Sequence, residues 1–253
     1  MLETPSSWVL PAHCVGLEPD EVHVWRVELD MPCADLAHQI GSLASDERAK
    51  ADRFHFAHDR ARYIAAHVAM RAILGRYLRV APAALVFSAT HSGKPFIQSP
   101  PQSGSTALTF NLSHAHDLAL IAVSMGHAVG IDVERICPEL AEQHIAEHFL
   151  APEEVTALRA LPLEVQAVAF FNCWTRKEAF VKARGEGLSL PLDRFTVTLA
   201  PGQPAALLSA ADDSVQASRW QLWSLEPGPS YAAALAVDCP RCRVITFRYS
   251  AAG

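Results

Sequence analysis

The sequence predicts an α+β protein in which helices and a mostly antiparallel set of strands recur in two lobes. Segments of strand length alternate between apolar and polar residues, while longer segments repeat apolar residues at helical spacing. The chain has 253 residues, enough for one large domain or two small ones with a sizeable core. Half of the residues are hydrophobic and 19% are charged, which is typical of folded globular proteins and argues against disorder.

The first half of the chain carries both kinds of signal. Ser45, followed by Asp46 and Glu47, is typical of a helix N-terminus, where a capping side chain and first-turn acids are favoured. In the next helix Tyr63 and Met70 lie on one apolar face. The expected helices are residues 45–56 and 59–78, and the expected strands are residues 21–29, 106–113 and 118–124.

The second half repeats the mixture. Val129, Ile131 and Val133 alternate with glycine and acidic residues, which predicts a strand over residues 129–134 with one polar face. A long helix is expected to end at Gly185, a residue favoured just after a helix. The expected helices are residues 139–149, 152–161 and 164–184, and the further strands are residues 195–199, 219–225, 231–237 and 243–249. No low-complexity linker separates the halves, so we expect two closely packed lobes, residues 1–125 and 126–253.

Charge and hydropathy exclude several functional classes. The 27 acidic and 21 basic residues give a net charge of −6, so no general basic field favours nucleic acid as a partner. No apolar run reaches the roughly 18 residues that a membrane-spanning helix needs. The N-terminus lacks the basic region of a secretory signal, and we expect a cytoplasmic protein.

Six cysteines are present without regular spacing, and in a cytoplasm they are expected to be reduced thiols. Cys239 and Cys242 form a single Cys-x-x-Cys motif with no second pair. A structural zinc site needs four ligands, so we interpret these residues as two thiols in a turn before the last strand.

Two acidic residues share one face of the strand over residues 129–134. Because side chains alternate along a strand, Asp132 and Glu134 point to the same side while Ile131 and Val133 enter the core. Adjacent carboxylates repel unless a cation lies between them, and oxygen ligands suit Mg²⁺. We expect Gly130 to leave room beside the metal. The alternative is a solvated strand face with two exposed acids.

The long helix carries a second pair of charged residues. Glu178 and Lys182 are four positions apart and therefore lie on one helix face. Glu178 is a candidate third metal ligand, and Lys182 a candidate phosphate-binding cation. Trp174, one turn earlier, is expected to anchor the helix in the core. The alternative is an ordinary helix salt bridge between Glu178 and Lys182, which contributes little to stability.

Ser113 and His114 end an earlier strand and are candidate phosphate ligands. Because adjacent strand residues point to opposite faces, His114 is poorly placed to activate Ser113 as a nucleophile. Scattered basic residues, among them Lys50, Arg62 and Lys94, do not form the Gly-rich phosphate-loop motif. Their usual meaning is a solvated surface.

The motifs, taken together and in order, resemble the larger, two-lobed surfactin-type 4′-phosphopantetheinyl transferases. They are the segments 111–114 (Asn-Leu-Ser-His), 130–134 (Gly-Ile-Asp-Val-Glu) and 174–182 (Trp-Thr-Arg-Lys-Glu-Ala-Phe-Val-Lys), with Gly-Lys-Pro at 93–95 and the loop 185–191. The resemblance covers roughly residues 45 to 200. It implies a pseudo-dimer of two similar α/β lobes within one chain, and hence a monomer.

The resemblance also implies the reaction. An enzyme of this family transfers 4′-phosphopantetheine from coenzyme A to a serine of an acyl or peptidyl carrier protein, as used in fatty acid, polyketide or nonribosomal peptide biosynthesis, and releases 3′,5′-ADP. Asp132, Glu134 and Glu178 would hold Mg²⁺, or Mn²⁺ in its place. Glu178 is the better candidate base for the serine hydroxyl, and Glu134 is the alternative.

The remaining assignments follow from the same resemblance. Lys182, Ser113 and His114 would bind phosphate oxygens, with Lys94 and Arg62 near the nucleotide. The helix over residues 45–56 carries Glu47 and Asp52, which we expect to dilute its positive charge, so Lys50 is its one residue assigned to the 3′-phosphate.

The two lobes are expected to divide the work. Residues 1–125 would face coenzyme A, and residues 126–253 would hold the metal and dock the carrier protein through the loop 185–190. Two other functions remain open: a non-catalytic relative that only binds carrier proteins or coenzyme A, and a magnesium-dependent hydrolase of a nucleotide pyrophosphate.

Overall fold

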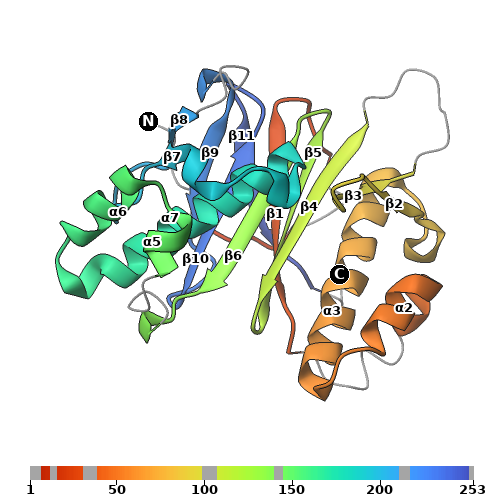
Figure 1. Ribbon diagram of the computed structural model, residues 1–253. Coiled ribbons are helices and arrows are strands. Elements are labelled where there is room, and N and C mark those ends of the chain that lie inside the picture. The colour runs from red at the N-terminus through yellow and green to blue at the C-terminus, as the bar shows by residue number, and fades with distance from the viewer. Residues whose placement is uncertain are drawn as a thin grey trace.

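The computed structural model describes residues 7–11, 16–30, 39–98, 107–139, 145–210 and 217–250. These residues form two main sheets with helices on their outer faces and two small two-stranded sheets, so the predicted α+β class is confirmed (Figure 1). Within the described part of the chain, no helix is long and apolar enough to cross a membrane.

The first sheet has the strand order β11-β1-β5-β4. Its strands are β1 (Glu21–Glu28), β4 (Leu108–Ala115), β5 (Leu118–Met125) and β11 (Arg243–Arg248). β5 pairs antiparallel with β1 and with β4, whereas β11 runs parallel to β1. Helices α3 (Ala57–Leu78) and α2 (Ser45–Ala51) lie beside this sheet.

The second sheet is antiparallel, with the order β6-β10-β9. Its strands are β6 (Val129–Arg135), β9 (Gln221–Leu225) and β10 (Tyr231–Val237). The long helix α7 (Leu163–Arg184) crosses one face, and α5 (Ile145–Phe149) and α6 (Pro152–Arg159) pack beside it (Figure 1).

Alternation along the strands produces three core layers. In β1, Trp25 and Val27 pack toward α3, while Val22 and Val24 face the second sheet. In β6, Ile131 and its neighbours two positions away join the layer between the sheets. The opposite faces of β6 and β10 therefore turn toward α7, and on β10 that face carries only alanines over residues 232–236. Small side chains there let α7 lie close to the sheet.

Short elements connect these layers. The hairpin strands β2 (Phe87–Ala89) and β3 (Pro95–Ile97) and the strand β8 (Leu207–Ala210) have too few residues for a clear alternation, and the sequence did not predict them. β8 pairs with β7 (Phe195–Val197). The 3₁₀ turns are η1 (Ile40–Ser42), η2 (Pro82–Ala84), η3 (Gly187–Ser189), η4 (Leu192–Arg194) and η5 (Ala217–Arg219).

Most boundaries lie within about two residues of the expected ones, and the first helix differs most. The first helix ends at Ala51 instead of reaching residue 56, and part of the helix expected at residues 139–149 lies outside the described residues. The division into residues 1–125 and 126–253 stays a prediction. One strand departs from that simple division, because β11 follows the second sheet in sequence yet completes the first sheet beside β1.

Gly130 has a different role from the one expected. A β-carbon at this position would lie 2.1 Å from the carbonyl oxygen of Ala179 and 2.3 Å from the backbone nitrogen of Ala183. The glycine therefore allows β6 and α7 to touch backbone to backbone. The expectation that it clears space beside a metal was wrong.

We predict that Gly130→Ala lowers the free energy of unfolding by about 1–3 kcal/mol or more, because the new methyl group must push α7 away from β6. Gly41→Ala is the matched control, since a β-carbon there meets nothing within 4 Å. Urea unfolding of both variants measures the difference. Equal stability of the two variants would contradict this account of the contact.

Candidate active site

The edge strands of the two sheets, β4 and β6, are joined through side chains. Asn111 Oδ1 accepts a hydrogen bond of 2.8 Å from the backbone nitrogen of Ile131. The Val133 backbone nitrogen likewise lies 3.4 Å from Ser113 Oγ, at the limit of a hydrogen bond. Both polar side chains are buried. Asn111 belongs to the motif over residues 111–114, but the sequence did not predict its role. Its hydrogen-bond partner is a backbone atom 20 residues away, which no local pattern reveals.

Asp132 lies at this junction and is only 2% exposed. Its Oδ1 accepts hydrogen bonds from Ser113 Oγ at 2.9 Å and from Lys182 Nζ at 2.5 Å. Its Oδ2 is buried without a hydrogen-bond partner among the described residues. A buried carboxylate oxygen without a partner is costly, so this atom is a natural ligand for a cation.

Glu134 and Glu178 face the same opening as Asp132. The three carboxylates line a cavity of about 350 Å³, together with His114, Trp174 and Lys182 among others. Burial raises the pKa of Glu134 to about 7, and the negative charge of Asp132 adds to this rise. Burial and Asp132 also raise the pKa of Glu178. The alternative of a solvated strand face with two exposed acids was therefore wrong, since Asp132 is buried and Glu134 is half-buried.

The carboxylates share a cavity but are not drawn together to ligand spacing. Within the described residues, their oxygen atoms do not form a set that lies within 4.8 Å of one another. Lys182 occupies part of the space, since its ammonium group contacts both Asp132 and Ser113. The simple helix salt bridge between Lys182 and Glu178 is thus not the arrangement adopted.

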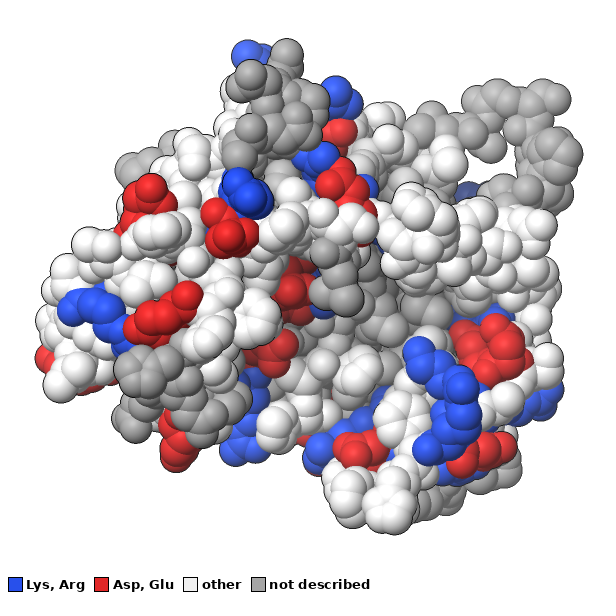
Figure 2. Space-filling view, viewed as in Figure 1, with Lys and Arg blue, Asp and Glu red and all other residues white. Residues whose placement is uncertain are grey.

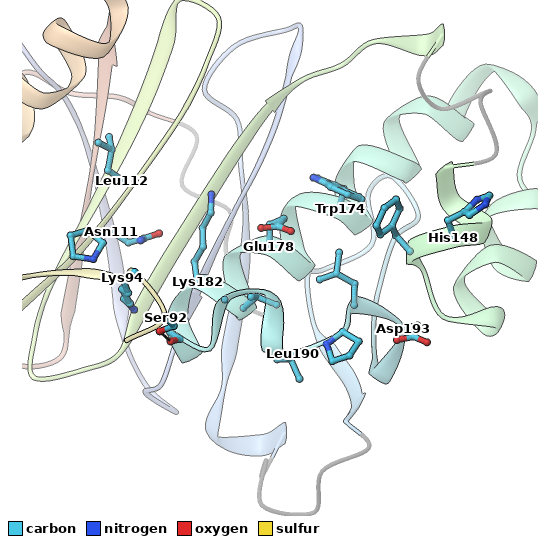
Figure 3. Close-up of a pocket in the computed structure, with 18 residues that line it drawn as sticks. Ser92, Lys94, Asn111, Leu112, His148, Trp174, Glu178, Lys182, Leu190 and Asp193 are labelled. Atoms are coloured by element: carbon cyan, nitrogen blue, oxygen red, sulfur yellow. Dashed lines mark hydrogen bonds between the residues drawn. The ribbon is translucent and has the colours of Figure 1, made fainter. Parts of the chain in front are cut away.

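A larger cavity of about 720 Å³ adjoins the acidic one, and Glu178, Lys182 and Trp174 line both. Figure 3 shows Glu178 between Lys182 and Trp174 along α7. Trp174 is half-buried and contacts the ring of Phe149 at 5.7 Å between centroids. It also packs against the core ring of Phe170 at 5.9 Å between centroids, so the expected anchoring of the helix is confirmed, and its outer side forms part of the cavity wall. The other walls are largely apolar and include Leu112, Val181 and Leu190.

The β2–β3 hairpin closes one end of the larger cavity. Lys94 Nζ donates hydrogen bonds to the carbonyl oxygens of Val129 at 2.9 Å and Ala183 at 3.0 Å. Ser92 Oγ donates to the carbonyl oxygen of Gly185, just past the end of α7. Burial lowers the pKa of Lys94 to about 8. Lys94 therefore holds the end of α7 beside β6, and its assignment to the nucleotide stays a prediction.

Comparison with known proteins identifies the family. Residues 128–236 match the 4′-phosphopantetheinyl transferase superfamily, and residues 29–126 match the 4′-phosphopantetheinyl transferase N-terminal family. The 4′-phosphopantetheinyl transferase HetI of Nostoc sp. is 38% identical over 231 residues, 91% of this chain and 93% of that protein. The chain belongs to the 4′-phosphopantetheinyl transferases. The resemblance drawn from the motifs is confirmed, and the protein is an enzyme of the transferase class.

Other transferases agree. The chain is 30% identical to Sfp of Bacillus subtilis over 178 residues, 70% of this chain and 76% of that protein. It is 36% identical to psf-1 of Bacillus pumilus over 166 residues, 65% of this chain and 67% of that protein. The two matched family regions meet near residue 127, where β5 leads into β6.

The two acids that were expected to dilute the charge of α2 both have arginine partners. Glu47 is buried and accepts a 2.7 Å hydrogen bond from Arg71 Nε, and Asp52 pairs with Arg60 at 2.8 Å. Each of these acids is paired with an arginine of α3, while Asp46 also lies in the first turn of α2. The expected dilution of the positive charge stays a prediction. Figure 2 shows Lys and Arg side chains gathered over α2, with acidic groups beside them.

The other side chains expected to bind coenzyme A lie at different distances from the two cavities. Lys50 Nζ lies 5.4 Å from the ring centre of Tyr63. His114 lies at the rim of the smaller cavity that Ser113 also lines; the surrounding protein atoms lower its pKa, and repulsion from His67, Lys182 and Lys50 adds to this. Lys50 and Lys182 therefore lie close enough to His114 to disfavour its protonated form. Arg62 is paired with Asp30 at 2.9 Å and lines neither cavity described above.

We predict that the metal-free transferase loses stability as the pH rises from about 4.5 to about 7. In that interval an unfolded chain releases the Glu134 proton while the folded chain retains it, so unfolding becomes more favourable. The expected loss is on the order of 2 kcal/mol after allowance for solvent screening. Chemical denaturation at several pH values measures it. Glu134→Gln should flatten the profile, whereas the exposed control Glu153→Gln should leave it unchanged; identical profiles for all three proteins would refute the assignment.

Proposed function

We propose that this transferase moves 4′-phosphopantetheine from coenzyme A to a serine of an apo acyl or peptidyl carrier protein and releases 3′,5′-ADP. The observation that carries the proposal is the convergence of three carboxylates and Lys182 at the junction of the two sheets, beside a large cavity. This arrangement supplies metal ligands, a phosphate-binding cation and room for a long substrate in one place.

The oxygen donors of the acidic cavity suit a hard divalent cation, Mg²⁺ or Mn²⁺, which would draw the three carboxylates together. Its candidate ligands are the oxygens of Asp132, Glu134 and Glu178, and oxygen ligands suit these ions. The unpaired Oδ2 of Asp132 and the raised pKa values of both glutamates are what a site short of positive charge should show. When bound, the cation would offset the negative charge of the pyrophosphate and of the departing phosphate.

The protein side chains position the phosphates and take the proton. Lys182 lines both cavities and offers its ammonium group to a phosphate placed between them, with Ser113 and His114 on the β4 side. Glu178 also lines both cavities, whereas Glu134 lines only the smaller one of the two. A raised pKa suits a general base near neutral pH, so Glu178 is the preferred proton acceptor and Glu134 the alternative.

The transfer balances without a covalent intermediate on the protein. The serine oxygen forms a bond to the β-phosphorus of coenzyme A as its proton passes to the base. The bond from that phosphorus to the bridging oxygen breaks, and 3′,5′-ADP leaves with the electron pair. The aligned geometry and charge stabilisation supply most of the catalysis in such phosphoryl transfers.

The two ends of coenzyme A need different surroundings. The larger cavity has the apolar walls and the size typical of small-molecule sites, so we place the pantetheine arm there, against Trp174 and Val181. We place the nucleotide toward α2, where Lys50 would meet the 3′-phosphate, with Lys94 and Arg62 as further candidates. The carrier protein would approach the loop 185–190; Leu190 lines the larger cavity, and the side chain of Leu188 lies outside what the structure describes.

The other two functions share parts of this site. A non-catalytic relative has no need for the intact set of three carboxylates and Lys182. A nucleotide pyrophosphate hydrolase would use the same metal ligands with water in place of the serine. Because a single chain supplies both sheets of the site, we propose a monomer, and we place it in the cytoplasm.

We predict that the protein adds the mass of phosphopantetheine to an apo carrier protein when coenzyme A and Mg²⁺ are present. Excess EDTA should stop the reaction, and Glu178→Gln should lower kcat/KM at least about a hundredfold as it removes a ligand and the base. The exposed Glu153→Gln is the control. Intact-protein mass spectrometry of the carrier gives the readout. Release of 3′,5′-ADP without a modified carrier would indicate the hydrolase, and no reaction of coenzyme A at all would indicate a binding protein.

We predict that Lys50 recognises the 3′-phosphate. A lost charge-assisted hydrogen bond costs roughly 1.5–3 kcal/mol, so Lys50→Ala should lower kcat/KM for coenzyme A about ten- to hundredfold. The same variant should barely change kcat/KM for dephospho-coenzyme A, which lacks that phosphate. Arg194→Ala removes an exposed cation elsewhere on the protein and serves as the control. An equal loss with both substrates would assign Lys50 to another part of the ligand.

A further inference from the structure

Two chain crossings between the sheets lie side by side. One is the turn from β5 to β6, which contains His127, and the other is the turn from β10 to β11, which contains Cys239 and Cys242. The Asp238 backbone nitrogen donates a 3.0 Å hydrogen bond to the Ala128 carbonyl oxygen and ties the two turns together.

This arrangement brings three soft or borderline metal ligands into one cluster. A ring nitrogen of His127 and the two sulfur atoms all lie within 4.8 Å of one another. Both cysteines are 6% exposed, while His127 is half-buried. The sequence could not show this cluster, because the histidine precedes Cys239 by more than a hundred positions. The absence of a second Cys-x-x-Cys pair had spoken against a zinc site, and His127 supplies a ligand that argument lacked.

The cysteine turn is shaped by contacts that do not involve sulfur. Gln221 Nε2 donates a 2.6 Å hydrogen bond to the Pro240 carbonyl oxygen, and Gln221 Oε1 accepts one of 3.3 Å from the Cys242 backbone nitrogen. The two sulfur atoms are bonded to each other in this structure, which differs from the reduced thiols expected from the sequence. Because Gln221 holds the turn, reduction leaves two thiols facing His127.

Both ring nitrogens of His127 contact backbone carbonyl oxygens. Its Nδ1 and Nε2 each lie 3.0 Å from a carbonyl oxygen, of Asp238 and Pro19 respectively. A neutral imidazole donates from one nitrogen only, so in that form the other contact sets a lone pair against a carbonyl oxygen. Binding of a metal at that nitrogen requires the carbonyl oxygen to move aside and removes this unfavourable contact. The opposite N–H then donates to its carbonyl, as is usual for a ligating histidine.

We infer that His127, Cys239 and Cys242 form a binding site for Zn²⁺ or a similar thiolate-preferring cation when the cysteines are reduced. A thiol or phosphine reductant supplies two electrons, and two protons complete the thiols; binding of the cation as a dithiolate complex releases those two protons. Thiolate and imidazole ligands select zinc over magnesium, so this site is chemically distinct from the carboxylate cavity. With three protein ligands, the fourth position falls to water. The bound ion would fasten the two crossings that connect the sheets.

The test uses the full-length protein, reduced with a phosphine, freed of metal and titrated with Co²⁺ as the probe. We expect one equivalent to bind with the near-ultraviolet absorption of cobalt–thiolate bonds and to be displaced by Zn²⁺. Cys239→Ser with Cys242→Ser should abolish the signal, and His127→Gln should weaken binding about ten- to hundredfold. Cys137→Ser is the matched control and should change nothing.

Further measurements distinguish loss of the metal site from misfolding, and a metal site from a disulfide that is purely structural. Circular dichroism and carrier modification should match the wild type in His127→Gln, since that residue lies outside the proposed catalytic machinery. The inference is overturned if the reduced wild type shows free thiols and no cobalt–thiolate absorption, which would leave a disulfide and nothing more. It is equally overturned if folded His127→Gln binds Co²⁺ as tightly as the wild type.

Discussion

The whole site depends on how two sheet edges meet. β4 and β6 are adjacent, yet the described contacts between them run through Asn111 and Ser113 instead of a backbone ladder. A side-chain link keeps the strands joined while satisfying the β6 amides of Ile131 and Val133. It also leaves the polar face of β6 open beside β4. Asp132 is fixed there because the same Ser113 hydroxyl that meets Val133 also donates to its carboxylate.

Placing three carboxylates at one opening costs stability, which the fold offsets elsewhere. Burial and mutual repulsion raise the pKa of both glutamates, and Lys182 supplies the one ammonium group in contact with Asp132 among the described residues. The rest of α7 is held firmly: Lys177 is buried and pairs with Glu154 at 2.7 Å. Repulsion between buried acids at the site, with tight packing around it, is the usual compromise between stability and activity.

The sequence predicted those features that arise from local periodicity. Alternation located β1, β4 and β6 and showed that Asp132 and Glu134 share a face, while helical spacing placed Glu178 and Lys182 together. It failed where the partner is distant in sequence. The role of Gly130 depends on the backbone of α7, and the ion pair of Glu47 depends on Arg71, so neither could be derived from neighbouring residues. The family motifs predicted the chemistry, but not which contacts build the site.

One helix can serve both cavities because of its period. Trp174, Glu178 and Lys182 are each separated by four residues, so they form one stripe that runs along the boundary between the cavities. The stripe works only if α7 neither rotates nor slides. Gly130 sets its distance from β6, and Lys94 bonds the carbonyl oxygen of Ala183, the residue after Lys182. A rotation of α7 by one residue, about 100°, would turn the whole stripe away from Asp132. The contacts at the end of α7 are therefore as necessary to the site as the charged side chains that face it.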